Sequence, residues 1–334
     1  MKLLIVGFAQ PGHMGQYLAS AAKRLGLDYQ IMDAAQAEAS SRIVRSFYWR
    51  FRSKRPARLE EFGAHVLAAS AVMHPKCVLT TGCGQLNRLH VERLRALGAT
   101  VINYSTDDPW NPKLYAPWFL RALPSYNSVF TPRRANIDDF HRCGLKAVHY
   151  LPFGYDADVH CPWPEGRPAA VPSDVLFVGG CDEDRAPLIN SLIDVGLDLA
   201  LFGGYWDRHA KARRHWRGIA DQETIRSASA AARICLCLTR RSNRDGHTMR
   251  SFEAAAIGGC ILAEDTVDHR ELFGPDDLAV RYFKTIPELV QQTKHLLADG
   301  DARRRLSSQL AERFGRGKHT YADRLTSMLK SLDG

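Results

Sequence analysis

The sequence contains no apolar run long enough to cross a lipid bilayer. Nowhere in its 334 residues is there a stretch that approaches the roughly 18 consecutive apolar positions of a spanning helix. The first apolar run, residues 2–8, leads into glycines and lacks the small-residue cleavage site of a signal peptide. We therefore expect a cytoplasmic protein. Its length favours two domains, because a single hydrophobic core seldom extends over so long a chain.

Cysteine pairs of the Cys-x-x-Cys type are absent as well. The eight cysteines are scattered, and Cys235 and Cys237 alternate within the apolar run 234–238, where buried thiols are ordinary. These spacings argue against a zinc site and against a disulfide framework. Basic residues outnumber acidic ones by 45 to 36, which gives a net charge of +9. That excess favours anionic ligands or surfaces without identifying them.

Short continuous apolar runs alternate with amphipathic stretches through the first half of the chain. Strands of a parallel sheet are covered on both faces, so they are expected as continuous apolar runs. The sequence predicts one doubly wound α/β domain over residues 1–152. Its expected strands are 2–8, 28–34, 77–82, 100–105, 128–132 and 147–153, with helices between them.

A proline-rich segment separates this pattern from a second copy of it. Residues 153–173 show no periodicity and are typical of a linker. Residues 174–318 then predict a second Rossmann-like domain, and an amphipathic helix over 319–334 is expected to cross back to the first domain. The expected strands of the second domain are 174–180, 198–204, 234–240, 259–265 and 278–283.

The turn after the first strand is a candidate ligand loop. Glycines stand at Gly7, Gly12 and Gly15, but Gln10 replaces the first glycine of the dinucleotide fingerprint. Asp33, at the end of the second strand, is placed as the ribose-binding acid of a nicotinamide-dependent enzyme would be. A plain tight turn without a ligand explains the same glycines, so both interpretations stay open.

The turn after the first strand of the second domain is a second candidate. Gly179 and Gly180 allow the backbone to approach a ligand closely, and Arg185 stands at the start of the next helix. The planar fork of an arginine there can pair with a diphosphate, although most single arginines are solvated surface residues.

The stretch 247–259 begins as a helix that Thr248 would cap at its amino end. Arg250 lies in the first turn, where a cation opposes the helix dipole and a bound anion would compensate. Glu253 lies one turn further, where a carboxylate can accept both hydroxyl protons of a ribose diol. Asp245 precedes the helix within reach of a sugar. A surface glutamate beside a packed alanine face is the alternative for Glu253.

Residues 247–283 resemble the nucleotide-sugar-binding region of GT-B glycosyltransferases, most closely the spore-maturation-protein-like family. That family is similar to the large retaining family that carries a Glu-x7-Glu motif, and here the two positions are Asp245 and Glu253. Further stretches that look like the family are 105–111, 129–144, 150–156 and 319–325. The resemblance implies a GT-B fold, with two Rossmann-like parallel-sheet domains facing a cleft. It also implies that Glu253 contacts the donor ribose, and Asp245 the transferred sugar or its phosphate.

The resemblance further implies a sugar transfer from a UDP-, GDP- or dTDP-sugar, without a metal or another cofactor. The donor is expected on the second domain and the acceptor (a glycan, lipid or protein) on the first. Helix dipoles and basic side chains would then stabilise the leaving diphosphate. The expected donor-site groups are Gly179, Gly180, Arg185, Thr248, Arg250, Glu253 and Asp245, with Arg240 and Arg241 as weaker options.

Similarity to retaining enzymes implies front-face transfer, in which the leaving phosphate takes the acceptor proton. An inverting reaction would need a base from the first domain. The candidates on that acceptor side are His13 beside Gly12, and Asp107 or Asp108 after the fourth strand. His13 would otherwise only cap its helix, and Asp107 and Asp108 would only form an Asx turn before Pro109.

Residues 41–58 hold seven basic residues and no acidic one. Ile43, Phe47 and Phe51 recur every four residues, so one helical face is apolar and the rest strongly positive. Such a helix can rest on an anionic membrane or grip an anionic acceptor, or it can pack as an ordinary domain helix with a solvated basic face. No recognised nucleic-acid-binding motif accompanies the charge, so we do not expect a nucleic acid partner. A nicotinamide-dependent enzyme and a non-catalytic nucleotide-binding relative remain the alternatives to a transferase.

Overall fold

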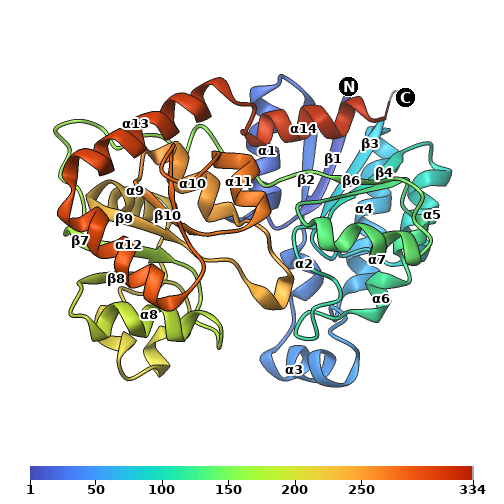
Figure 1. Cartoon of the computed structure of the whole chain (residues 1–334). Coiled ribbons are helices and arrows are strands. Elements are labelled where there is room, and N and C mark those ends of the chain that lie inside the picture. The colour runs from blue at the N-terminus through green and yellow to red at the C-terminus, as the bar shows by residue number, and fades with distance from the viewer. Residues whose placement is uncertain (333–334) are drawn as a thin grey trace. The chain divides into compact units, whose positions relative to one another are not determined.

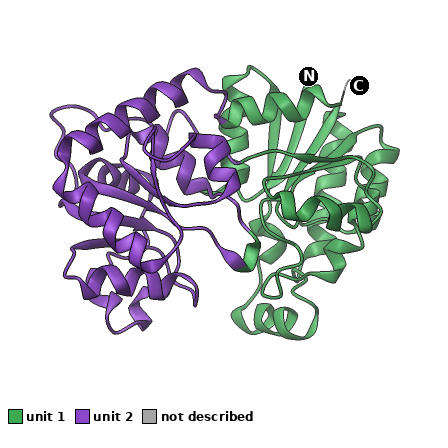
Figure 2. Cartoon of the chain, in the orientation of Figure 1, with its two compact units in different colours: residues 1–152, 242–244, 321–334 green, residues 153–241, 245–320 purple. Residues whose placement is uncertain are grey.

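The computed structural model describes residues 1–332, and the chain divides into two compact units (Figure 2). Unit 1 comprises residues 1–152, the short segment 242–244 and the chain from Tyr321 onward. Unit 2 comprises residues 153–241 and 245–320. The segment 242–244 is therefore flanked on both sides by residues of unit 2 but packs with unit 1. None of the described helices combines the length and the apolar character that crossing a bilayer requires.

Unit 1 is built on a six-stranded parallel sheet in the order β2-β1-β3-β4-β5-β6 (Figure 1). All six strands that the apolar runs predict are present, although β6 is shorter than expected. They are β1 (Lys2–Gly7), β2 (Asp28–Asp33), β3 (Cys77–Thr81), β4 (Thr100–Tyr104), β5 (Ser128–Thr131) and β6 (Val148–Tyr150). The inner strands are mostly buried because helices cover both faces of the sheet, and this is why they are largely apolar.

Helices fill the connections between these strands. Because β1 pairs with β2 on one side and with β3 on the other, the strand order reverses between β1 and β3. The carboxyl-terminal helix α14 packs on α1, and Tyr17 and Tyr321 stack with ring centroids 5.2 Å apart. The helices are α1 (Met14–Arg24), α2 (Ala35–Glu38), α3 (Arg42–Phe51), α4 (Leu59–Met73), α5 (Arg88–Ala96), α6 (Pro117–Leu120), α7 (Ile137–Arg142) and α14 (Tyr321–Lys330).

The predicted amphipathic helix within residues 41–58 forms as α3, with Ser41 as its capping residue. Its apolar face is largely exposed: Ile43 is 82% exposed, Phe47 47% and Phe51 71%, and none of the helix residues is fully buried. This exposure does not favour the interpretation of the segment as an ordinary packed domain helix. In Figure 1 the helix projects from unit 1 beyond α2 and away from the sheet.

Unit 2 holds a five-stranded parallel sheet in the order β11-β10-β9-β7-β8. The expected linker is residues 153–173. Residues 153–172 contain no helix and no extended strand, whereas Ser173 already begins the first strand of the sheet. The backbone N–H of Phe153 donates to Nε2 of the buried His247 at 3.2 Å. The strands are β7 (Ser173–Val178), β8 (Leu199–Phe202), β9 (Ala232–Cys237), β10 (Ile261–Glu264) and β11 (Arg281–Phe283). The helices are α8 (Arg185–Asp194), α9 (Gln222–Ala231), α10 (Met249–Ile257), α11 (Val267–Phe273), α12 (Ile286–Ala298) and α13 (Gly300–Arg316).

Candidate functional site

The strand order of unit 2 reverses between β7 and β9. From β7 the chain passes through α8 to β8 on one side, and it then returns through α9 to β9 on the other side. Ligands of open parallel sheets bind at the carboxyl ends of the strands next to such a reversal. The loops that follow β7 and β9 therefore define the candidate site of unit 2, and they contain the residues singled out at 179–185 and 239–245.

At Gly179 the loop after β7 lies in close contact with the loop after β8. A Cβ atom there would lie 2.8 Å from the Phe177 ring. The loop after β8 approaches from the other side: Gly203 has φ +128°, and a Cβ on it would lie 2.4 Å from the Gly179 carbonyl oxygen. The Trp206 indole N–H donates to that same oxygen at 2.8 Å. The two loops are thus locked together, whereas Gly180 is less crowded.

Arg185 is buried at the reversal point, with 5% of its surface exposed. Its guanidinium donates to the carbonyl oxygens of Gly180, Leu238 and Thr239 at 3.3, 3.1 and 3.3 Å, and so it connects the ends of β7 and β9. Burial, followed by the charge of Arg240, lowers the pKa of Arg185. Arg185, which the sequence predicts as a partner of a diphosphate, is therefore a clamp that shapes the loops of the site, and it is not the solvated surface arginine of the alternative interpretation.

Helix α10 begins after Thr248, as the sequence predicts, but the Thr248 side chain does not cap the helix. Its hydroxyl instead lies 3.3 Å from the Ser251 hydroxyl. Arg250 pairs with Glu253 one turn later through Nη1 and Oε2. The Arg250 side chain is 31% exposed and that of Glu253 only 2%, so the arginine lies between the carboxylate and solvent.

Glu253 is a buried carboxylate whose two oxygens differ in their hydrogen bonding. Its second oxygen, Oε1, has no hydrogen-bond partner among residues 1–332 and lies 3.6 Å from the ring nitrogen Nε2 of His160. His160 Nε2 is in turn 3.1 Å from Oε1 of Gln222. A cavity of about 20 Å³, room for one water molecule, adjoins Glu253 and Arg250. Burying a carboxylate oxygen without a hydrogen-bond partner lowers the stability of the folded protein. A ligand that donates a hydroxyl group to this oxygen would remove that cost.

Asp245 closes the loop that precedes α10. Its backbone N–H donates to the Arg240 carbonyl at 3.3 Å, and its carboxylate accepts from the Arg240 N–H at 3.3 Å. Arg240 also lies 3.8 Å from Asp182, whose carboxylate caps the start of α8 by accepting from the N–H groups of Asp184 and Arg185. Arg241 is exposed. Within the described residues, no cluster of three or more His, Cys, Asp or Glu side chains is arranged to hold a metal ion.

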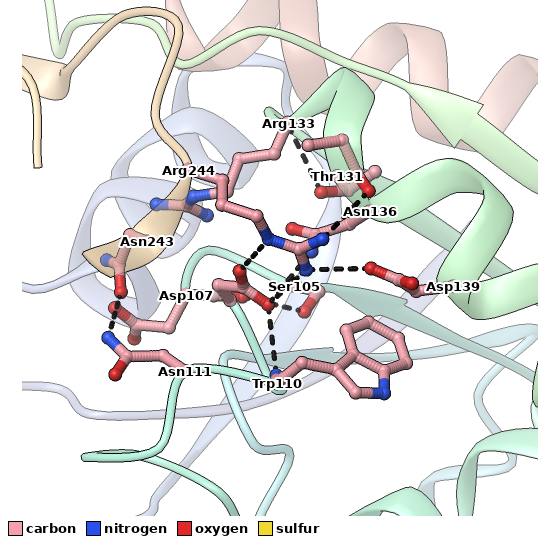
Figure 3. Close-up of polar contacts among 12 residues, drawn as sticks. Ser105, Asp107, Trp110, Asn111, Thr131, Arg133, Asn136, Asp139, Asn243 and Arg244 are labelled. Carbon is pink, nitrogen blue, oxygen red and sulfur yellow. Dashed lines mark hydrogen bonds and ion pairs between the residues drawn. The ribbon is translucent and has the colours of Figure 1, made fainter. Parts of the chain in front are cut away.

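In unit 1, the segment 242–244 enters a buried polar cluster at the carboxyl ends of β4 and β5 (Figure 3). Arg244 Nε and Nη2 donate to the two oxygens of Asp108 at 2.6 and 2.9 Å, and Nη2 lies 2.7 Å from Asp139. Asn243 accepts a hydrogen bond of 2.6 Å from the Asn111 side chain. Hydrogen bonding to Asp108 raises the pKa of the Arg244 guanidinium. Sequence analysis did not single out Arg244, although it directly precedes Asp245.

Asp108 is fully engaged in this cluster. It is 1% exposed, and beyond Arg244 it accepts from the Trp110 N–H and the Asn136 side chain, each at 2.9 Å. The Trp110 bond is the Asx turn that the sequence suggests as the alternative to catalysis. This geometry favours an anchoring role for Asp108 over that of a base. The carboxylate of Asp107 is half-buried and has no hydrogen-bond partner in the described part of the chain, so it is the freer acid of the two.

The loop between β1 and α1 lies at the strand reversal of unit 1. Gly12 has φ +86°, which a non-glycine residue adopts at a cost, and Gly15 packs so tightly that a Cβ would lie 2.5 Å from the Phe8 carbonyl oxygen. His13 is exposed, and its side chain does not cap α1. Asp33 accepts from the Ala9 N–H at 3.2 Å and from the Gln10 side chain at 3.1 Å. It holds this loop in place, which does not favour the ribose role required by the nicotinamide alternative.

A second feature of unit 1 is a pocket of about 500 Å³ at the base of α3. Its lining includes the basic residues Arg42, Arg45 and Lys54, the aromatic Trp49 and the acidic Glu38. Lys54 is held there by hydrogen bonds of 2.9 and 3.3 Å to the carbonyl oxygens of Pro112 and Tyr115.

Comparison with known proteins identifies the fold. Residues 185–330 match the family described as "Glycosyl transferase-like". No curated protein sequence matches the chain significantly. The structure is similar to sucrose-phosphate synthase from Thermosynechococcus elongatus (TM-score 0.70, 14% identity, 99% of each chain covered). It is also similar to Anabaena HepE in complex with UDP-glucose (0.68, 12%, 100% of this chain and 99% of that one) and to T4 phage BGT in complex with its UDP-glucose substrate (0.60, 14%, 100% of each).

These similarities confirm the predicted fold class: the chain has the GT-B fold of two parallel-sheet α/β units. At such low identity they establish the fold alone. The resemblance to the spore-maturation-protein-like family, and the correspondence of Asp245 and Glu253 to a Glu-x7-Glu motif, stay predictions.

Proposed function

We propose that this protein is a glycosyltransferase that moves a sugar from a nucleotide-sugar donor, with the donor bound by unit 2. The observation that carries the proposal is Glu253, a buried carboxylate near the start of α10 with one oxygen that lacks a hydrogen-bond partner in residues 1–332. The family match over residues 185–330 includes this helix, and two of the similar structures hold UDP-glucose. UDP-glucose is therefore the first donor to test.

The ribose of the donor is assigned to Glu253. Two adjacent hydroxyl groups can each donate to one oxygen of a carboxylate, and hydrogen bonds to a charged group in a buried site are strong. Arg250 now occupies Oε2 of Glu253, and its partly exposed side chain can exchange that partner for a phosphate oxygen. In this scheme one movement of Arg250 uncovers the glutamate and places a cation on the diphosphate.

The diphosphate is assigned to the loop edge formed by Gly179 and Gly180 and to the amino end of α10, where backbone dipoles favour an anion. Arg185 supports this edge from beneath through its three carbonyl contacts. Arg240, with 40% of its side chain exposed, is the second cation after Arg250 that can reach a phosphate. We propose that these groups stabilise the leaving diphosphate without a metal.

The acceptor side is assigned to unit 1 and the transferred sugar to Asp245. We propose retention of configuration. The acceptor oxygen forms a bond to the anomeric carbon while the bond from that carbon to the phosphate oxygen breaks, and the acceptor proton passes to the leaving phosphate. If inversion occurs instead, His13 or Asp107 is the base, because Asp108 is committed to Arg244. The acceptor itself is not defined by these residues.

Calorimetric titration tests the proposal. UDP-glucose, a GDP-sugar, a dTDP-sugar and NADH would be titrated into the wild type, Glu253→Gln and the matched control Glu312→Gln, which alters an exposed carboxylate of α13. We expect one nucleotide-sugar to bind the wild type and the control equally, and to bind Glu253→Gln about tenfold or more weakly. Thermal unfolding would verify that Glu253→Gln is folded. Binding of NADH alone would overturn the proposal, and binding without transfer or hydrolysis would identify a non-catalytic relative.

Metal independence and retention of configuration are tested separately. Binding and turnover that persist with a chelator present support metal independence, and loss of turnover contradicts it. The anomeric proton coupling in the product spectrum distinguishes retention from inversion.

A further inference from the structure

The exposed apolar residues of this protein are concentrated in one helix. Eighteen large apolar side chains are exposed among the described residues, and five of them lie in the ten residues of α3. Three recur at intervals of four and share one face: Ile43 is 82% exposed, Phe47 47% and Phe51 71%. The rings of Phe47 and Phe51 lie 5.3 Å apart, so they form a continuous apolar stripe. Clusters of this kind mark interaction surfaces.

Basic residues lie along one edge of the stripe and on the opposite side of the helix. The segment 41–58 carries seven basic residues and no acidic one. Arg50 lies beside Ile43 around the helix axis, and Arg42 and Arg52 lie on the opposite side of the helix. None of these three arginines has an ion-pair partner among the described residues, and all three are exposed. Their charge is therefore available to an external anionic surface.

The helix is held in place at its carboxyl end, so its apolar face stays outward. The chain reverses after α3 through Ser53 and Lys54, which have φ values of 53° and 58° in the left-handed region. Lys54 Nζ then donates to the carbonyl oxygens of Pro112 and Tyr115, and the Arg58 N–H donates to the Ala37 carbonyl at 3.0 Å. These contacts are made by other residues of the segment and leave the side chains of the stripe exposed. Figure 1 shows α3 projecting from unit 1.

We propose that α3 docks the protein on an anionic membrane, lying in the interface with Ile43, Phe47 and Phe51 inserted among the acyl chains. Ten helical residues extend for only about 15 Å, which is too short to span a bilayer and suits a helix that lies in its surface. Insertion of apolar groups and attraction of basic groups are the two signals that together give stable binding. A second copy of the chain is a poorer occupant, because it would bring two strongly basic helices together.

Vesicle sedimentation tests the proposal on the full chain. We expect the wild type to bind vesicles that contain phosphatidylglycerol, to bind pure phosphatidylcholine vesicles far more weakly, and to dissociate as salt is raised. The variant I43S/F47S/F51S should lose about tenfold or more in affinity. The variant R42Q/R50Q/R52Q should lose about fivefold for each arginine removed.

Matched control variants alter equally exposed residues elsewhere. V72S/I219S/V267S removes apolar side chains that are 84%, 84% and 71% exposed, and K294Q/R304Q/R316Q removes three positive charges from α12 and α13. Both controls should bind vesicles like the wild type. Equal losses in the controls, equal binding to neutral vesicles, or no binding would each overturn the proposal.

Light scattering tests the alternative that a second copy of the chain covers the stripe. A dimer in solution that I43S/F47S/F51S converts to a monomer would show that a second copy covers the stripe, and it would overturn membrane docking. The inference does not depend on the proposed function. Titration with UDP-glucose reports on unit 2, so loss of donor binding with vesicle binding intact contradicts only the transferase, and the reverse result contradicts only the docking surface.

Discussion

Arg244 offers the sharpest test of how unit 1 is held together. Its guanidinium bonds both oxygens of Asp108 at 2.6 and 2.9 Å and lies 2.7 Å from Asp139, and Asp108 is 1% exposed. Replacing Arg244 by alanine leaves two buried carboxylates without their cation. Loss of a partner from a fully buried ion pair costs about 3–5 kcal/mol. The Arg244 side chain is 40% exposed, so water can partly replace it, and we expect a loss of about 2 kcal/mol.

The backbone at Arg244 allows a second, more specific comparison. Its φ of +52° lies in the left-handed region, where a side chain costs roughly 1–2 kcal/mol relative to glycine. Arg244→Gly should therefore be less destabilised than Arg244→Ala by about 1 kcal/mol, although both remove the same contacts. This order would be the reverse of the usual one, in which glycine is the more destabilising residue.

Urea unfolding followed by fluorescence measures these differences. The control is Arg304→Ala, which removes an arginine from an exposed pair with Asp301 and should change the free energy of unfolding by less than about 0.5 kcal/mol. If Arg244→Ala is no less stable than this control, the cluster around Asp108 does not stabilise unit 1. If Arg244→Gly is the least stable of the three, the account of the backbone is wrong.

Three further predictions concern unit 2. Burial lowers the pKa of His269 to about 4, so between pH 6.5 and about 4 the chain takes up a proton when it unfolds. The free energy of unfolding should therefore fall by about 3 kcal/mol as the pH is lowered over that range. A pH series in which His269→Asn shows the same decline would contradict this. Gly203→Ala should lower the free energy of unfolding, measured by urea titration, by about 2 kcal/mol or more, because its φ is +128° and a Cβ atom would meet the Gly179 carbonyl. The control Gly196→Ala, whose Cβ would have no atom within 4 Å, should lower it by less. Burial raises the pKa of the Cys237 thiol to about 12, so alkylation of Cys237 should require unfolding, and rapid labelling of the native protein would refute its burial.

The sheets of this protein were predictable from the sequence because they are parallel and buried. The inner strands of such a sheet are covered on both faces, so strands such as β3 and β9 appear as largely apolar runs. The order of these runs along the chain predicts doubly wound units. The start of α10 after Thr248 was predictable because a threonine, a residue type favoured at helix starts, precedes an alanine-rich run, although its side chain makes no capping hydrogen bond. Glu253 could be placed near the start of that helix, but its burial beneath Arg250 could not be foreseen.

The polar contacts that span long sequence distances were not predictable. Nothing in the sequence around Asp108 indicates that its partner is Arg244, because the pairing depends on how residues 242–244 pack into unit 1. The same limit applies to Arg185, which was expected to pair with a diphosphate and whose guanidinium bonds carbonyl groups at the ends of two strands. Periodicity showed that α3 is amphipathic, but an apolar face has the same pattern whether it packs inward or stays exposed.

Hydrogen–deuterium exchange would locate directly the nucleotide-sugar that we propose binds at the strand reversal of unit 2. The full chain would be compared with and without UDP-glucose. We expect slower exchange in peptides covering residues 179–185 and 248–253, with no change in the loop at residues 7–15. Protection confined to residues 7–15, or none in unit 2 at donor concentrations that saturate the calorimetric titration, would contradict this proposal.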